Sequence, residues 1–170
     1  MARPDDLLDK LGDLQHDFQR DLRKAHKRLK QSIPAYLRES HPLSFLSAPI
    51  IYSVIVPIAL LDLWVSLYQW VCFPLFRIKS VRRRDYIVID RHKLAYLNGI
   101  EKFNCVYCGY TNGVFAYVRE ITGRTETYWC PIRHARKPHD THDHYDDFVA
   151  YGDAAGYKRR LPVLRRGLKQ

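Results

Sequence analysis

The stretch LSFLSAPIIYSVIVPIALLDLWVSLYQWVCFPLF, residues 43–76, carries a single formal charge, at Asp62. A bilayer core about 30 Å thick needs roughly 20 apolar residues in an α-helix, so this block is long enough to cross. Trp64, Tyr68 and Trp70 gather toward its end, as aromatic side chains do at a membrane interface. The block starts too late, and is too long, for a cleaved signal peptide. We therefore expect a membrane segment at 43–76, and the competing interpretation is a buried hairpin of a soluble domain.

Two modes of insertion are compatible with the residues that flank this block. A single crossing leaves the stronger basic flank, RIKSVRRR at 77–84, in the cytoplasm. Alternatively, a break at Pro57 makes two short helices that enter and leave by one face, which places both flanks in the cytoplasm. Asp62 needs a partner or water in either case, and a functional role and simple hydration are both open for it. Both modes predict that the chain after residue 77 is cytoplasmic.

The positive charge of the chain is concentrated after the apolar block. The net charge is +10, and residues 77–170 hold nineteen Lys/Arg against ten Asp/Glu, whereas residues 1–42 hold nine against seven. Residues 82–84 and the basic tail at 151–170, which ends GYKRRLPVLRRGLKQ, predict contact with an anionic inner leaflet. Nucleic acid is the competing partner, and it is disfavoured because the adjacent membrane already offers an acidic surface.

Residues 1–42 predict an amphipathic helical region. One stripe at spacings of three and four consists of Leu7, Leu11, Leu14, Phe18, Leu22, Ala25 and Leu29. Acidic residues come early and basic residues late, which complements the helix dipole, and Pro34 is expected to end the helix. Such a stripe packs against the chain's own domain, against a second copy in a homo-oligomer, or along a membrane.

The sequence FNCVYCGY, residues 103–110, opens a candidate metal site. Cys105 and Cys108 are followed by Cys130 and His134 in the pattern C-x2-C-x21-C-x3-H, which suits a tetrahedral zinc ion. A thioredoxin-type redox pair would leave the later two residues unexplained, and a disulfide is disfavoured in a reducing cytoplasm. Unrelated buried cysteines are the remaining alternative, and Cys72 is interpreted as a small apolar residue.

The cysteine-containing segments resemble the two metal knuckles of rubredoxins. CVYCGY, residues 105–110, matches the first knuckle, and Cys130 with Pro131 matches part of the second. The resemblance implies an iron site of four thiolates, but Arg133 stands at the fourth cysteine position and His134 follows it, which favours zinc over iron. The stretch from YIVID at 86–90 to YWCPIRHARK at 128–137 is also similar to small uncharacterised bacterial membrane proteins. This similarity implies the bacterial inner membrane.

Residues 77–150 are expected to form a small cytoplasmic α+β metal-knuckle domain of the zinc-ribbon or rubredoxin-like type. DYIVID (85–90) and TETYWC (125–130) look like strands, and HKLAYLNGIEKF (92–103) looks helical until Asn98–Gly99 interrupts it. Between the cysteines, GVFAYVREITG (113–123) predicts a short helix that packs over the metal through Val114, Tyr117 (or Val118) and Ile121. A structural ion would reinforce so thin a core.

The stretch KPHDTHDHYDDF, residues 137–148, gathers His139, His142 and His144 among aspartates. His142, His144 and Asp146 spell H-x-H-x-D, which resembles the metal motif of metallo-β-lactamase-type hydrolases. That family has a histidine where Asp147 stands here, and its scaffold is too large for this chain. We expect a polar loop with Asp caps, from which His144 could replace His134 as a ligand.

These observations predict a membrane-anchored protein whose structural Cys3His zinc site supports an interaction or assembly module. All four metal positions are filled by protein groups, which leaves none for a catalytic water, and no catalytic residues are predicted. A membrane protein is a further candidate partner. The alternative is a rubredoxin-like iron protein that transfers electrons to a membrane partner.

Overall fold

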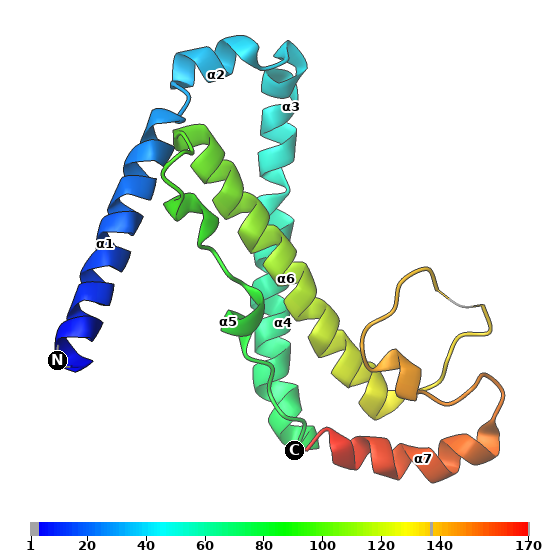
Figure 1. The fold of residues 1–170 in the computed structure, drawn as a ribbon. Helices are drawn as coiled ribbons and strands as arrows, with labels where there is room; N and C mark the ends of the chain where they lie inside the picture. Colours follow the sequence, from blue (N-terminus) through cyan, green and yellow to red (C-terminus); the bar gives the residue numbers. More distant parts are fainter. Residues whose placement is uncertain (1–3, 137, 170) are drawn as a thin grey trace. The chain divides into compact units, whose positions relative to one another are not determined.

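The computed structural model describes residues 4–136 and 138–169, with the side chains of residues 4–14 and 16 left undescribed. Its elements, in chain order, are α1 (Pro4–Arg28), α2 (Ile33–Glu39), α3 (Pro42–Ser53), α4 (Ile55–Phe76), α5 (Arg83–Tyr86), η1 (Arg91–Lys93), α6 (Gly99–Trp129), η2 (Tyr145–Asp147) and α7 (Ala154–Gly167) (Figure 1). The described chain contains no strand, only one isolated parallel bridge between Ile132 and Val149. The expected α+β class with a rubredoxin-like knuckle is therefore wrong, because these residues fold into helices.

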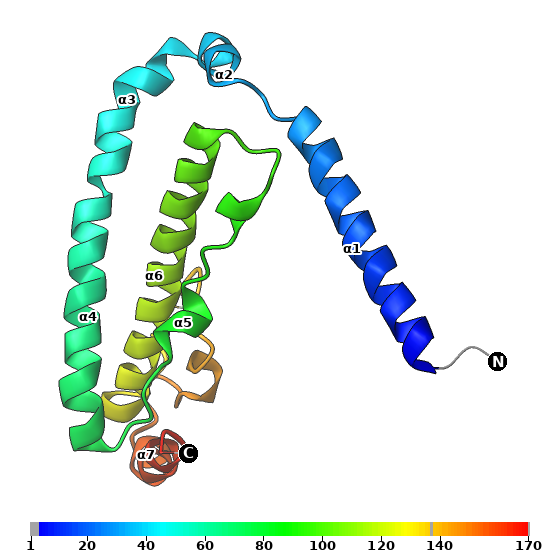
Figure 2. The ribbon, with the colours of Figure 1, turned by 90° about the vertical axis from the view of Figure 1, so that its left-hand side faces the viewer.

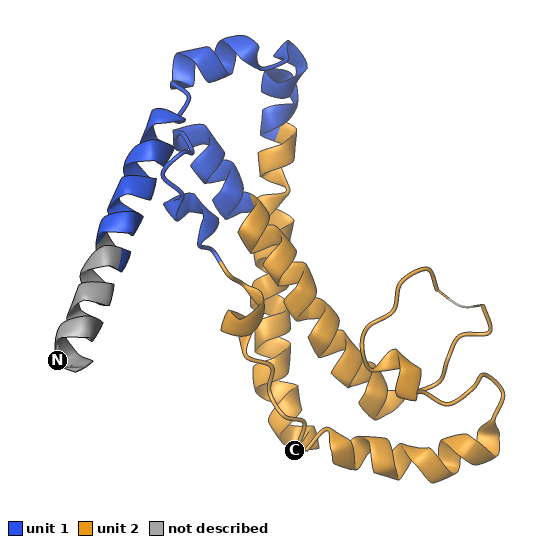
Figure 3. Cartoon of the chain, in the orientation of Figure 1, with its two compact units in different colours: residues 1–49, 89–107 blue, residues 50–88, 108–170 orange. Residues whose placement is uncertain are grey.

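The chain divides into two compact units, which Figure 3 colours separately. Unit 1 comprises Met1–Pro49 and Ile89–Tyr107, and unit 2 comprises Ile50–Val88 and Cys108–Gln170.

In unit 1, the first helix ends earlier than the proline suggested. Helix α1 ends at Arg28, and Pro34 lies in the first turn of α2, where a missing N–H costs nothing. Ser32 caps α2 by accepting a hydrogen bond from the Ala35 N–H at 3.4 Å. In the predicted stripe, Phe18, Leu22 and Leu29 are exposed, and the side chains of Leu7, Leu11 and Leu14 lie outside the described residues.

The apolar block forms α3 and α4, and the chain does not reverse within residues 42–76. Val54, the one residue between the two helices, keeps right-handed helical angles of −61° and −20°. Pro57 lies in the first turn of α4, where proline is tolerated, and the short interruption at Val54 does not bring the reversal that a hairpin at Pro57 would need. Pro42–Phe76 is long and apolar enough to cross a membrane, which confirms that part of the sequence prediction.

Helix α4 ends at Phe76, and a return segment, residues 77–88, runs back beside it (Figures 1 and 2). Arg77 adopts a left-handed φ of 55°, and the Ile78 N–H bonds the Phe73 carbonyl at 2.8 Å, as in a Schellman motif. The strand predicted at 85–90 is wrong: residues 83–86 form α5. The Gln69 side chain instead pairs with both the N–H and the C=O of Val81, at 2.7 and 3.2 Å.

Helix α6 is one helix of 31 residues where the sequence suggested a metal turn, a short helix and a strand. Asn98 starts it: its Oδ1 accepts the N–H groups of Ile100 and Glu101 at 3.0 Å, while Glu101 accepts the Asn98 N–H at 2.8 Å. This reciprocal capping box begins a helix at the place where an interruption was expected. No proline follows within α6, and Gly109 stays helical, since the positive-φ residues described are Arg77 and Gly152.

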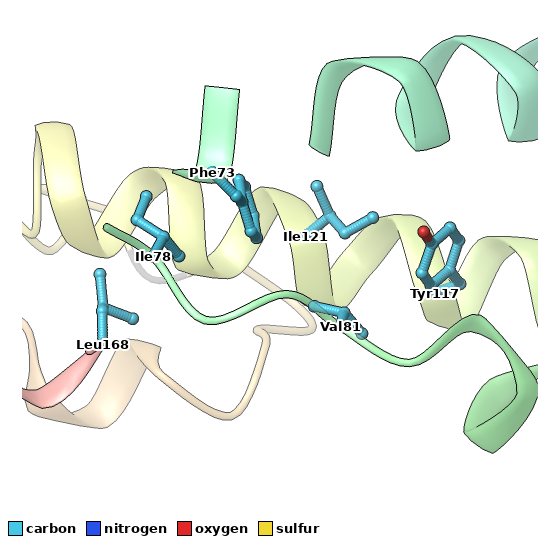
Figure 4. Close-up of a cluster of buried hydrophobic side chains, with 6 residues drawn as sticks. All are labelled: Phe73, Ile78, Val81, Tyr117, Ile121 and Leu168. Atoms are coloured by element: carbon cyan, nitrogen blue, oxygen red, sulfur yellow. The ribbon is translucent and has the colours of Figure 1, made fainter. Parts of the chain in front are cut away.

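The core of unit 2 lies between α4, the return segment, α6 and the end of the chain (Figure 4). It consists of Phe73, Ile78, Val81, Tyr117, Ile121 and Leu168. The predicted apolar face of residues 113–123 is confirmed as buried, but it packs on α4 and the return segment. Gly113 is required there, because a Cβ would stand 2.8 Å from the Ile87 Cα and 2.9 Å from the Tyr86 carbonyl oxygen.

The basic tail forms helix α7, which lies across the ends of α4 and α6 in both views (Figures 1 and 2). Asp153 caps it by accepting the Gly156 N–H at 2.8 Å, as expected for an Asp in this loop. Arg165 donates to the Tyr128 carbonyl at 2.8 Å and lies over the Tyr128 ring. Its guanidinium therefore attaches α7 to the end of α6.

Candidate functional site: a histidine–carboxylate cluster on α6

The four predicted metal ligands lie at opposite ends of α6. Cys105 and Cys108 are one turn apart near its start, and Cys130 follows its last residue. The helix between Cys108 and Cys130 is about 30 Å long, because each residue rises 1.5 Å. A zinc–sulfur bond is about 2.3 Å, so one ion cannot contact both sulfurs in this structure. All three are free thiols.

His134, the fourth predicted ligand, is held by Tyr145. Its backbone N–H donates to the Tyr145 hydroxyl at 2.8 Å, its Nδ1 lies 3.2 Å from the same oxygen, and the two rings stack. Partial burial raises the pKa of the nearby Cys130 thiol, and the negative charge of Glu126 raises it further. The described residues contain no group of three or more His, Cys, Asp or Glu side chains that could hold a metal ion. The zinc site stays a prediction from the sequence, without an assembled set of ligands here.

Two histidines of the loop after α6, His142 and His144, pack directly against that helix, and His144 is the residue predicted as an alternative ligand to His134. His142 Nε2 is 2.8 Å from Glu126 Oε2, and His144 Nε2 is 3.2 Å from Glu120 Oε2. Gly123 lies between the two glutamates, where a Cβ would stand 3.0 Å from each imidazole ring. The absence of a side chain at Gly123 lets both rings rest on the helix. We call these five residues the histidine–carboxylate cluster.

Arg124 lies beside this cluster and forms an ion pair with Glu120. Arg124 Nε donates to Glu120 at 2.7 Å, and its Nη1 donates to the Lys79 carbonyl at 2.6 Å. Burial raises the pKa of Glu120, but the Arg124 hydrogen bond and the charges of His144 and Arg124 outweigh it and hold that pKa below its ordinary value. Burial raises the pKa of Tyr86, and the Glu120 charge adds to the rise.

A pocket of about 360 Å³ opens beside the cluster. It is lined by Tyr86, Phe115, Ala116, Arg119, Glu120, His142 and Asp143. Arg119 is engaged by both carboxylate oxygens of Asp140, at 3.0 and 3.1 Å, and by the Thr141 carbonyl. An imidazole beside carboxylates can transfer protons, but the described lining contains no Ser, Thr or Cys nucleophile. The pocket therefore has acid–base groups without an assembled catalytic set.

The H-x-H-x-D residues do not act together. His142 and His144 pair with different glutamates, while Asp146 is exposed and its carbonyl accepts a bond from Arg133. His139 is exposed as well. The two glutamates were not among the predicted site residues. Their signal in the sequence is the spacing of Glu120, Gly123 and Glu126, three residues apart along one ridge of α6.

Asp62 has partners on the covered face of α4. Arg83 donates to both of its carboxylate oxygens at 3.0 and 2.6 Å, and the Tyr110 hydroxyl donates at 2.9 Å. The hydrogen bond from Arg83 to Asp62 raises the pKa of Arg83, and burial raises the pKa of Tyr110. Asp62 is 6% exposed, so the carboxylate serves as a structural ion-pair partner in this fold.

Comparison with protein-family models, with curated proteins and with solved structures finds no match for this chain.

Proposed function

We propose that this protein is a membrane-associated interaction or assembly module, held on the bilayer by the apolar α3–α4 block and presenting a folded helical head to the cytoplasm. Only 11% of the most apolar window of this block is buried in the structure. A soluble core helix would be largely covered. This exposure is the observation that supports the proposal most strongly.

The exposed face of α4 is uniformly apolar. It consists of Val56, Leu60, Leu63, Trp64, Leu67, Trp70, Val71 and Leu75. Single exposed apolar residues are ordinary, but a continuous face with two tryptophans marks an interaction or membrane surface. Lipid fits this face because Trp64 and Trp70, 71% and 75% exposed, are the side chains enriched at membrane interfaces.

Exposed basic residues support attachment to the cytoplasmic side of a bacterial inner membrane. The return segment beside α4 carries three exposed basic residues, Lys79, Arg82 and Arg84. Helix α7 carries three more at residues 158–160. Each base near an anionic leaflet contributes about 1 kcal/mol of attraction. The bias of Lys and Arg toward cytoplasmic flanks supports a cytoplasmic position for unit 2.

Zinc and iron are not part of this proposal, because the four sequence-predicted positions do not fit one ion in the present fold. Electron transfer through a rubredoxin-like site stays a prediction from the sequence, and the described residues do not form the knuckle fold that such a site would use. A membrane protein, or a second copy bound through the exposed residues of α1, is the partner class that an assembly module implies.

Membrane fractionation of paired variants tests the proposal. Leu60→Lys and Leu67→Lys each place a charge on the exposed α4 face, whereas Val163→Lys places the same charge on an exposed position of α7. We expect the unaltered chain and the α7 variant to stay in the membrane pellet at high salt, and the double α4 variant to become soluble. A wild-type chain that is soluble in dilute buffer would refute the proposal.

A further inference from the structure

We propose that the apolar block binds the bilayer from one side without crossing it, so that the residues before and after it share one compartment. This inference rests on the membrane association proposed above and specifies its geometry. The lipid-contacting surface is the exposed face of α4, and the covered face of α4 is turned toward the head.

Contacts inside unit 1 join the two sides of the block. The rings of His26 and Tyr96 meet edge to face with centroids 5.5 Å apart. A Cβ on Gly99 would stand 3.7 Å from the Ile33 side chain, which is ordinary van der Waals contact. Residues 26–33 precede the apolar block and residues 96–99 follow it. Both segments must therefore lie on the same side of any bilayer.

The number of crossings follows from this shared side. An odd number of crossings would separate the segments, and an even number above zero requires the apolar helix to reverse. Val54 keeps helical angles and the Ile58 N–H bonds the Val54 carbonyl at 3.3 Å, so the described block contains no reversal. Residues 77–95 hold frequent charges and no second apolar block. Zero crossings is the arrangement that satisfies these contacts.

The two faces of α4 within unit 2 match a one-sided attachment. Asp62, Gln69 and Phe73 are buried beneath the return segment and α6. The opposite side carries the apolar face already defined. The return segment and α6 cover the other side, so lipid can meet only this face, and a one-sided apolar face enters the boundary between headgroups and acyl chains by about 5–10 Å.

The charges of the return segment oppose a deeper position of α4 in the bilayer. Arg83 reaches Asp62 and Val81 reaches Gln69, so the segment lies beside α4 over this length. The neighbouring Arg84 and Asp85 side chains are 81% and 57% exposed. A charged side chain at the bilayer centre costs about 2.5–3.5 kcal/mol on insertion scales. A one-sided position leaves these charges in water.

Protease access to both ends of the full chain tests the shared compartment. The chain carries one epitope tag before Met1 and another after Gln170, and is probed in spheroplasts and in inverted inner-membrane vesicles. We expect both tags to survive in spheroplasts and both to be digested in inverted vesicles. Loss of only one tag from spheroplasts would overturn this inference while leaving membrane association intact. A chain absent from the membrane fraction would overturn both proposals.

A depth scan separates one-sided attachment from a hairpin, which also keeps both ends together. Single tryptophans are placed at the exposed positions 50, 60 and 75, or kept at Trp64, with the other native tryptophans changed to Phe. The probes are phosphatidylcholine vesicles brominated at acyl carbons 6 and 7 or at carbons 11 and 12. We expect the shallow bromines to quench more strongly than the deep ones at every position. The extent of quenching should differ by no more than about twofold between positions, because the whole face lies at one depth. A position quenched more strongly by the deep bromines would contradict the one-sided arrangement.

Discussion

The guanidinium of Arg83 binds the Asp62 carboxylate through two hydrogen bonds, from Nε to Oδ1 at 3.0 Å and from Nη2 to Oδ2 at 2.6 Å. Asp62 is the single formal charge of the apolar block, and its ion pair lies on the covered face of α4. A carboxylate that seemed misplaced in a membrane segment thus joins that segment to the head.

Replacing Arg83 by Met should destabilise the fold by about 1–2 kcal/mol, because a buried carboxylate loses its cation. The Arg83 side chain is 47% exposed, which keeps the effect toward the low end. Chemical unfolding in mild detergent, followed by tryptophan fluorescence, measures it. Arg84→Met is the control, since that side chain is 81% exposed. Equal stability of the two variants would show that the Asp62 pair contributes nothing.

Gly113→Ala should destabilise unit 2 by about 1–3 kcal/mol, the usual cost of overpacking. The new methyl would meet backbone atoms of Tyr86 and Ile87 at 2.8–2.9 Å, which cannot swing aside as a flexible side chain can. Gly167→Ala has no atom within 4 Å of its new methyl and should be neutral or mildly stabilising. Thermal unfolding of both variants compares their melting temperatures. An unchanged melting temperature for Gly113→Ala would mean that the return segment does not lie against α6.

Glu120 should give the fold a pH-dependent stability. Its pKa in the folded state lies below the ordinary 4.5, so its stabilisation is complete above that pH and is lost as pH falls through the folded value. Glu120→Gln should cost about 1 kcal/mol at pH 7, and the difference from wild type should shrink below pH 4.5. Urea unfolding across pH measures this. Asp85→Asn, at a 57% exposed site, should show no such convergence.

The substitution Cys130→Ser distinguishes what the structure predicts from what a zinc site at Cys130 predicts. Cys130 is an exposed free thiol, and surface substitutions of this kind usually change stability by less than about 0.5 kcal/mol. From the structure we expect an unchanged melting temperature and an unchanged metal content by elemental analysis. Loss of one bound zinc together with earlier melting would establish that Cys130 is a ligand, and α6 would then have to break between its ends.

Sequence periodicity predicted the features that depend on nearby residues. The apolar block and the face of Val114, Tyr117 and Ile121 were predicted correctly, because a helical repeat is a local property. C-x2-C spacing was ambiguous, since the same two cysteines can close a metal turn or lie one helical turn apart. The cap at Asn98 and Glu101 was visible in the sequence as N-x-x-E but was interpreted as an interruption.

Partners distant in sequence could not be predicted. Arg83 follows Asp62 by 21 residues, and His144 follows Glu120 by 24, with no periodicity to connect either pair. Only the path of the return segment and of the loop after α6 brings these charges together. The fold class was missed for the same reason, because a continuous α6 depends on its packing against α4 and the return segment.

Flotation of the purified chain with uncharged phosphatidylcholine vesicles in high salt tests the central claim of membrane association most directly. High salt screens the basic residues, so the remaining attraction must come from the apolar face of α4. We predict that the chain rises with these vesicles and that the Leu60→Lys, Leu67→Lys double variant stays at the bottom of the gradient. A wild-type chain that stays at the bottom, or that rises only with anionic vesicles in low salt, would contradict the claim.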